Sequence, residues 1–179
     1  MERYELERLE EMKEYLRKEK ELLTRERLKR MEDRFSDNVY HLKADLAAVL
    51  KGLAMERKEG SLVISYLRSS FITEKGEFYI AYYSGEPFVE EEPDSVFYSM
   101  KELLEGIEDD WDIMNRKLRE KFIRFMTSEQ EEIRRWYMDG IYEGMGRIFQ
   151  AALESAEGEK QVGVFYGNYM DRLEKIGWV

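Results

Sequence analysis

Residues 2–57 form a stretch without proline whose only glycine is Gly52. Such a stretch favours helix, and one helix of this extent would be roughly 80 Å long at about 1.5 Å per residue. A small domain cannot cover a rod of that length. We therefore expect part of it to find a partner, and this expectation constrains the fold more than any other feature of the chain.

An apolar stripe at seven-residue spacing runs along the first half of this stretch, through Leu9, Leu16 and Leu23. The companion heptad position carries Glu19 and Glu26, where a coiled coil requires apolar side chains. The stripe predicts a homodimer with the three leucines as its interface. Packing of this helix against the chain's own body and an isolated arm are the alternatives.

The apolar pattern continues into the second half of the stretch, where Ser36-Asp37-Asn38 could cap a new helix and kink the rod. We expect continuity instead, because the apolar phase carries through this point. His41 lies at the edge of the stripe and is interpreted as a half-buried polar residue. The stripe steps by three or four: Leu28, Met31, Phe35, Val39, Leu42, Leu46, Val49 and Leu53.

After Gly60 the pattern changes from a helical period to alternation, over Ser61–Thr73 and Glu77–Ser84. The glycine-containing turn Glu74-Lys75-Gly76 between them predicts an antiparallel hairpin. Helices can cover only one face of it. Of the sets Phe78/Ile80/Tyr82 and Tyr79/Ala81/Tyr83, we expect the second to face outward, with Tyr79 and Tyr83 exposed.

The remaining chain is interpreted as a loop at 85–98 followed by three helices. Capping-box patterns at Ser99 and Thr127 mark the first two, and a stripe over Val162–Ile176 predicts the last. Within the second of these helices Gly140, Gly144 and Gly146 indicate close approach of another helix or of a ligand. The predicted fold is mostly α with a small β-hairpin (α+β): a long N-terminal helix over 1–58, then a hairpin and a three-helix bundle over 59–179.

The charge of the chain is −10 and is unevenly spread. Residues 1–58 carry 15 basic and 14 acidic side chains, and the remainder carries 14 and 25, so the net charges are +1 and −11. An acidic body repels phosphate, which argues against a nucleic-acid or anionic-membrane partner and favours a basic protein. Plain solubility is the simpler explanation of this acidity. With no signal-peptide core at the start and no long apolar run, we expect a cytoplasmic protein.

Few chemistries are open to this composition. The absence of cysteine excludes disulfides and thiolate metal sites. A serine triad would need His41, the single histidine, in a packed helix. Glu90–Asp94 and the group Asp109, Asp110 and Asp112 are candidates for a weak divalent-cation site, with solvated surface as the simpler interpretation. We expect no metal, no cofactor and no enzymatic activity, although a catalytic carboxylate pair stays open.

Aromatic side chains are the one feature that suggests a site, because tyrosine and tryptophan favour interfaces and pockets of mixed polarity. The sequence therefore predicts a dimeric, cytoplasmic, non-enzymatic module that binds another protein through the hairpin and the acidic loop. The alternative is a small-molecule sensor with an aromatic pocket between hairpin and helices. The candidate binding residues are Tyr66, Tyr79, Tyr83, Trp111, Trp136 and Tyr137.

Overall fold

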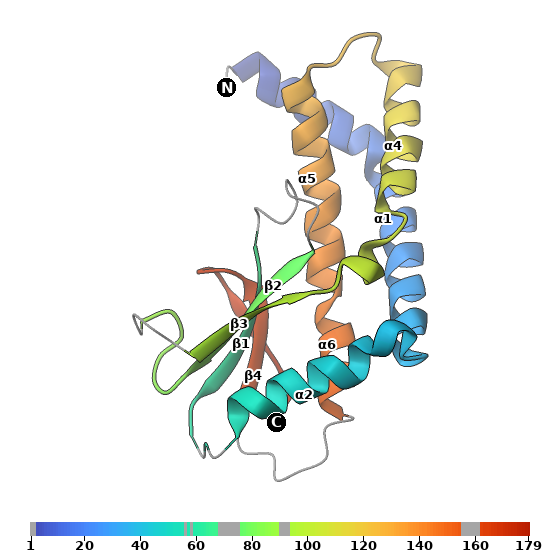
Figure 1. Ribbon diagram of the computed structural model, residues 1–179. Coiled ribbons are helices and arrows are strands. Elements are labelled where there is room, and N and C mark those ends of the chain that lie inside the picture. The colour runs from blue at the N-terminus through green and yellow to red at the C-terminus, as the bar shows by residue number, and fades with distance from the viewer. Residues whose placement is uncertain (1–2, 56, 58, 68–75, 90–93, 155–161) are drawn as a thin grey trace. The chain divides into compact units, whose positions relative to one another are not determined.

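The computed structural model (Figure 1) describes residues 3–55, 57, 59–67, 76–89, 94–154 and 162–179. They form two compact units: a helical unit of Met1–Arg30 with Glu105–Tyr142, and a sheet unit of Met31–Leu104 with Glu143–Val179. Each unit is built from two separate stretches of sequence. The chain passes between the units within helix α1 (Arg3–Ser36), within helix α5 (Thr127–Gly144), and at Leu104–Glu105.

The helical unit contains most of α1, α4 (Ile107–Lys121) and most of α5. Each helix buries one apolar side, and ion pairs join the helices to one another. Glu11 pairs with Lys121 at 2.9 Å, and Glu19 pairs with Lys117. The partner of Glu19 explains a glutamate at a position where a coiled coil would carry an apolar residue. The buried apolar residues are Leu9, Met12, Leu16, Leu23, Ile107, Met114, Leu118, Ile133, Tyr137, Met138, Ile141 and Tyr142.

The N-terminal rod is not continuous, so the expectation of one helix over residues 2–57 is wrong. α1 ends at Ser36, a 3-10 turn covers Val39–His41, and α2 spans Leu42–Ala54. Asn38 and His41 have φ angles of 52° and 60°. The Asn38 side-chain oxygen accepts hydrogen bonds from the N–H groups of Lys43 (3.1 Å) and Ala44 (3.3 Å). Asparagine tolerates the left-handed conformation and satisfies free donors in the first turn of α2.

The sheet unit holds a five-stranded mixed sheet in the order β3-β2-β1-β4-β5. The antiparallel pairing predicted for the hairpin is confirmed for β1 and β2, whereas residues 68–75, with most of the predicted turn, lie outside the described residues. β1 also pairs in parallel with β4. The strands are β1 (Ser61–Tyr66), β2 (Glu77–Tyr83), β3 (Asp94–Ser99), β4 (Gly163–Asn168) and β5 (Leu173–Trp178). The fold is therefore mixed, with long helices and a full sheet rather than an isolated hairpin.

Two segments are strands where the sequence suggested otherwise. Residues 94–99 belong to β3 and not to a loop, and the predicted final helix over Val162–Ile176 is the antiparallel pair β4–β5. The stripe of Val162, Phe165 and Tyr169 fits a helical period, but β-branched and aromatic residues also favour strands. β4 pairs with β1, which lies 102 residues earlier in the chain (Ser61 opposite Gly163), and this pairing favours the strand over the helix.

Two helices cover one face of the sheet, α2 and α6 (Gly146–Glu154) (Figure 1). The rings of Phe78 on β2 and Phe149 on α6 lie 4.9 Å apart in an edge-on contact, and Phe149 also contacts Tyr166 at 5.2 Å. The Tyr98 hydroxyl donates a 3.1 Å hydrogen bond to the Leu42 carbonyl.

The helix predicted to continue through residue 153 is divided in the structure into α5 and α6, with the break at Met145.

Candidate functional site

The sheet has two unlike faces, because successive side chains of a strand point to opposite sides. Phe78 and Ile80 are fully buried, and Phe78 packs against α6. The next residues of the same strand, Tyr79, Ala81 and Tyr83, lie on the other face. Aromatic side chains from three strands and two turns meet there, and we call this set the aromatic face: Tyr79, Tyr83, Phe88, Phe97, Phe165 and Tyr169.

Ring contacts join most of the aromatic face into one continuous cluster. Tyr79 lies 5.3 Å from Phe97 and 5.6 Å from Tyr169, measured between ring centroids. Phe88 joins Tyr169 at 5.4 Å and Tyr83 at 5.7 Å. Edge-on pairs of this kind contribute about 0.5–1.5 kcal/mol each beyond the area that they bury. The cluster is therefore ordered by its own contacts.

The outer part of this cluster is exposed to solvent. The side chain of Phe97 is 61% exposed and that of Tyr169 is 41% exposed, although Tyr79 and Phe88 beside them are half-buried. Phe88 holds a φ angle of 67°, which costs a non-glycine residue roughly 1–2 kcal/mol. Its contacts with Tyr83 and Tyr169 offset this cost. A rigid apolar surface that includes exposed aromatic rings is the usual form of a binding site.

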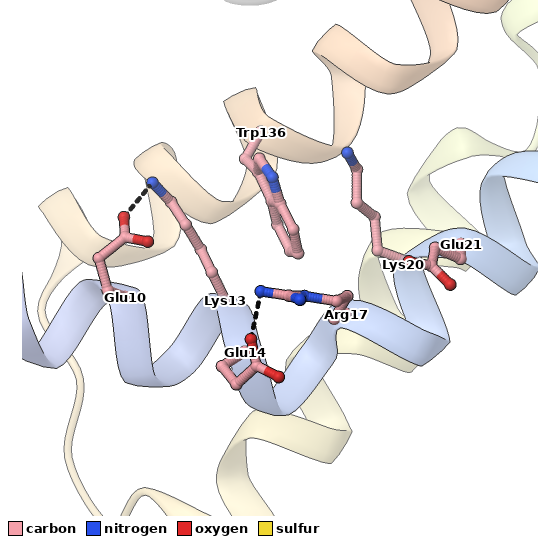
Figure 2. Close-up of a pocket in the computed structure, with 7 residues that line it drawn as sticks. All are labelled: Glu10, Lys13, Glu14, Arg17, Lys20, Glu21 and Trp136. Carbon is pink, nitrogen blue, oxygen red and sulfur yellow. Dashed lines mark hydrogen bonds and ion pairs between the residues drawn. The ribbon is translucent and has the colours of Figure 1, made fainter.

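A second candidate is a surface groove of about 650 Å³ in the helical unit, beside Trp136 of α5 (Figure 2). Lys13 and Lys20 flank the indole, and the Lys20 ammonium lies 4.5 Å from the ring centroid. Three carboxylates and three cations line the groove, and Lys13 pairs with Glu10 on its own helix at 2.9 Å. The charges of the lining side chains cancel. The groove therefore lacks the convergent set of like charges that would select a ligand.

A buried ionic cluster in the helical unit is the third candidate. The Arg27 guanidinium donates to the Asp110 carboxylate at 2.6 Å and to the carbonyls of Glu105 (2.8 Å) and Gly106. The Tyr137 hydroxyl donates to the same carboxylate at 2.6 Å. Burial, followed by this hydrogen bond, raises the pKa of Tyr137, and the bond to Asp110 raises the pKa of Arg27. Since its polar groups bond one another, this cluster fixes the helices rather than reacting with a substrate.

The structure does not gather the predicted binding residues into one site. Tyr79 is half-buried on the aromatic face, but the expectation of an exposed Tyr83 is wrong, because Phe88 covers it and leaves 2% of it exposed. Tyr66 is buried on the other face of the sheet, beside Tyr166. The other three belong to the helical unit, where Trp111 and Trp136 are half-buried and Tyr137 is fully buried.

The other predicted positions also have clear places. Leu9, Leu16 and Leu23 are at most 6% exposed and are covered by the chain itself. The interpretation of His41 as a half-buried helical residue is wrong, since it is exposed at the break before α2. Residues 90–93 of the acidic loop lie outside the described residues. Asp110 forms an ion pair with Arg27. Among the described residues, no three His, Asp or Glu side chains converge as a metal site would need.

Four members of the aromatic face were not among the predicted binding residues: Phe88, Phe97, Phe165 and Tyr169. For Phe97 a signal exists, because Val96, Phe97 and Tyr98 form a short β-branched and aromatic run, a composition that favours strands. For Phe165 and Tyr169 the helical interpretation of the C-terminus hid them. The alternative pocket between hairpin and helices is occupied by Phe78, Phe149 and Tyr166, none of them more than 5% exposed.

Comparison with known proteins adds no assignment: no protein-family model, no curated protein and no solved structure matches this chain. Within the described residues, every helix is too short or too polar to cross a bilayer. The functional argument therefore depends on the aromatic face and its surroundings.

Proposed function

We propose that this chain is a non-enzymatic cytoplasmic interaction module that binds a basic region of another protein through its aromatic face. The observation that carries the proposal is the exposure of Phe97 and Tyr169, at 61% and 41%, within a cluster of packed rings. Aromatic anchors held rigid before binding lose little conformational entropy in a complex. They are therefore well suited to supply affinity.

The charge of the sheet unit supports a basic partner. This unit carries 20 acidic and 12 basic side chains, a net charge of −8, whereas the helical unit carries 19 and 17, a net charge of −2. Opposite charge on a partner would accelerate its association, and an excess of negative charge opposes binding of phosphate backbones. Nucleic acid and anionic membrane are accordingly left out of the proposal.

The test compares two exposed apolar sites in one chain. A partner captured by the tagged wild-type protein from its own cells would be identified, purified and titrated calorimetrically against three proteins. We expect the double variant Phe97→Ser/Tyr169→Ser to bind at least about tenfold more weakly than wild type. The matched control is Ile123→Ser, since Ile123 is 97% exposed but lies in the helical unit. The proposal fails if the double variant binds like the wild type, or if Ile123→Ser loses as much.

A small-molecule sensor stays the alternative. Aromatic rings fill the space between hairpin and helices where its pocket was expected, so the candidate ligand site is the groove beside Trp136, whose lining charges cancel. Its volume of about 650 Å³ lies within the usual range of ligand sites. A metabolite that raises the melting temperature by mass action, and does so no longer in Trp136→Ala, would support this alternative. A panel without any such compound would count against it.

The homodimer also stays a prediction, but its interface would have to differ from the one expected. Leu9, Leu16 and Leu23 are buried within a single chain, so they cannot also form a seam without opening the helical unit. Light scattering at high micromolar concentration decides the matter. A mass near 21.6 kDa would exclude the dimer.

A further inference from the structure

Strand β3 forms one border of the sheet, and β5 forms the other. Among the described residues, no strand pairs with the outer side of β3 (Figure 1). Such an edge presents backbone N–H and C=O groups in the spacing of a strand. A second extended chain can form hydrogen bonds with these groups, which is a common mode of peptide recognition.

The register identifies the backbone groups that point outward. In an antiparallel pair, hydrogen-bonded positions alternate with positions whose N–H and C=O point away from the neighbouring strand. The Met100 N–H donates to the Gly76 carbonyl at 3.0 Å, which makes this pair a bonded one. Counting back by two, Tyr98, Val96 and Asp94 bond to β2. Ser95 and Phe97 therefore turn their backbone groups to the outer side of β3.

β3 lacks the charged residues and the irregular pairing that discourage a further strand from binding at β5. β5 carries adjacent Glu174 and Lys175, and its pairing with β4 is interrupted by a register shift at Val164/Phe165. Charges and bulges of this kind discourage a further strand. Between Ser95 and Ser99, by contrast, β3 has no charged residue, no proline and no register shift. β3 is thus the edge that is open to pairing.

The two sides of β3 differ in chemistry. The side chains of Ser95 and Phe97, whose backbone groups point outward, lie on the side of the aromatic face, where Phe97 contacts Tyr79. On the other side of β3, burial raises the pKa of Tyr98 to about 12, and the negative charges of Asp45 and Glu102 contribute to this rise. A strand beside β3 would therefore meet aromatic rings on one side and carboxylates on the other.

We propose that β3 accepts an extended segment of the partner protein as a sixth strand, with apolar side chains toward the aromatic face and basic side chains toward the acidic side. This inference rests on the proposed function and names its mode of recognition. A second copy of the sheet unit fits less well, since each copy carries a net charge of −8.

The test uses a labelled synthetic peptide, Lys-Phe-Lys-Val-Lys-Phe-Lys, and fluorescence anisotropy with the full-length protein. Two further versions carry N-methyl groups either on the apolar residues or on the inner lysines. A strand turns alternate N–H groups to opposite edges, so only one set can bond to β3. We expect one methylated version to bind at least about tenfold more weakly and the other to bind like the parent. The version with Glu in place of Lys should also lose at least about tenfold.

Variants of the protein provide the reciprocal test. Ser95→Pro removes one outward N–H without removing a bond to β2, a position where edge strands tolerate proline. We expect about tenfold weaker peptide binding for Ser95→Pro and a change within about twofold for the matched control Ser95→Ala. If Ser95→Pro does not fold by circular dichroism, the methylated peptides on the wild type decide.

The outcomes separate this inference from the proposed function. Equal binding of all three lysine peptides, or no saturable binding up to about 1 mM, overturns strand addition. If Phe97→Ser abolishes peptide binding while neither methylation nor Ser95→Pro changes it, strand addition fails and the aromatic face stands. If Phe97→Ser also leaves the affinity for the captured partner unchanged, both strand addition and the proposed function fail.

Discussion

The helical unit and the sheet unit use their polar residues in opposite ways. In the helical unit charges of both signs are nearly equal, and several of them pair across helices, as Glu11 does with Lys121 at 2.9 Å. In the sheet unit acidic residues predominate, and one side of the sheet ends in exposed aromatic rings. The difference indicates that ion pairs hold the first unit together internally, whereas the second leaves aromatic rings exposed on the surface where we propose that a partner binds.

The largest expected effect concerns the helical unit. Arg27→Met leaves the buried Asp110 carboxylate without its counter-ion and with the Tyr137 hydroxyl as its donor, so we expect a loss of about 3–5 kcal/mol in the free energy of unfolding. Urea denaturation followed by tryptophan fluorescence measures this loss, since Trp111 and Trp136 lie in the helical unit and Trp178 lies in the sheet unit. The control is Arg30→Met on the same helix, whose exposed pair with Glu26 contributes roughly 0.5 kcal/mol or less. A loss below about 1 kcal/mol for Arg27→Met would contradict a role for the cluster in holding this unit together.

The next effect separates buried from exposed residues on the aromatic face. Tyr83→Ala should cost about 3 kcal/mol, because its ring is 2% exposed and packs over Val63 and Ala81. Phe97→Ala should cost roughly 0.5 kcal/mol or less in the isolated protein, since 61% of the ring is already in water. Both values come from chemical denaturation. Similar losses for the two variants would mean that the face is core throughout and offers no open surface.

A third comparison applies one substitution to both units. A Cβ at Gly140 would lie 3.1 Å from the flexible end of Lys20, so Gly140→Ala should stabilise the helical unit by up to about 1 kcal/mol. A Cβ at Gly146 would lie 3.1 Å from the ring of Tyr166, which is stacked on Phe149. Gly146→Ala should therefore destabilise the sheet unit by about 1–3 kcal/mol. Melting temperatures that shift in the same direction would refute this contrast.

Tyr98→Phe has a small expected effect on stability at neutral pH, and its main effect is on how stability changes at alkaline pH. The pKa of Tyr98 in the folded protein is about 12, above the ordinary value of 10.0. Between these values the unfolded chain loses the proton and the folded chain keeps it, so stability falls as pH rises from 10 to 12. Tyr98→Phe should reduce the fall in this window, at a cost of about 1 kcal/mol at neutral pH for the lost bond to Leu42. Chemical denaturation at several pH values measures the stability of both proteins at neutral pH and between pH 10 and 12. If the variant loses as much stability in the alkaline range as the wild type, Tyr98 does not contribute to that loss.

The local patterns of the sequence were sufficient to predict a long N-terminal helix, the pair β1–β2 and the start of α5 at Thr127. The helix start predicted at Ser99 is wrong, because Ser99 ends β3 and α4 begins at Ile107. The local patterns also placed Tyr79, Ala81 and Tyr83 on the side of the hairpin away from α6, as the burial of Phe78 and Ile80 confirms. These features depend on neighbours that are close in sequence. Periodicity reports such neighbours directly.

The features that could not be predicted depend on distant partners. The strand at Gly163–Asn168 exists because it pairs with Ser61–Tyr66, and no local pattern records that pairing. Tyr83 is buried by Phe88, which comes from a loop whose path the sequence leaves open. The Glu19 carboxylate is useful in its helix only because Lys117 of α4 lies opposite. The aromatic face combines three strands and two turns, so it becomes visible only with the sheet assembled.

The division of each unit into two sequence segments has a consequence for how the protein is made. α1 leaves the ribosome before α4 and α5, and Asp110, the buried partner of Arg27, follows 83 residues later. At about 5–20 residues per second, that delay lasts roughly 4–17 s. During this time Leu9, Leu16 and Leu23 have neither α4 nor α5 to cover them. The nascent chain therefore carries an uncovered leucine stripe of the kind that chaperones bind, long before the sheet unit can form.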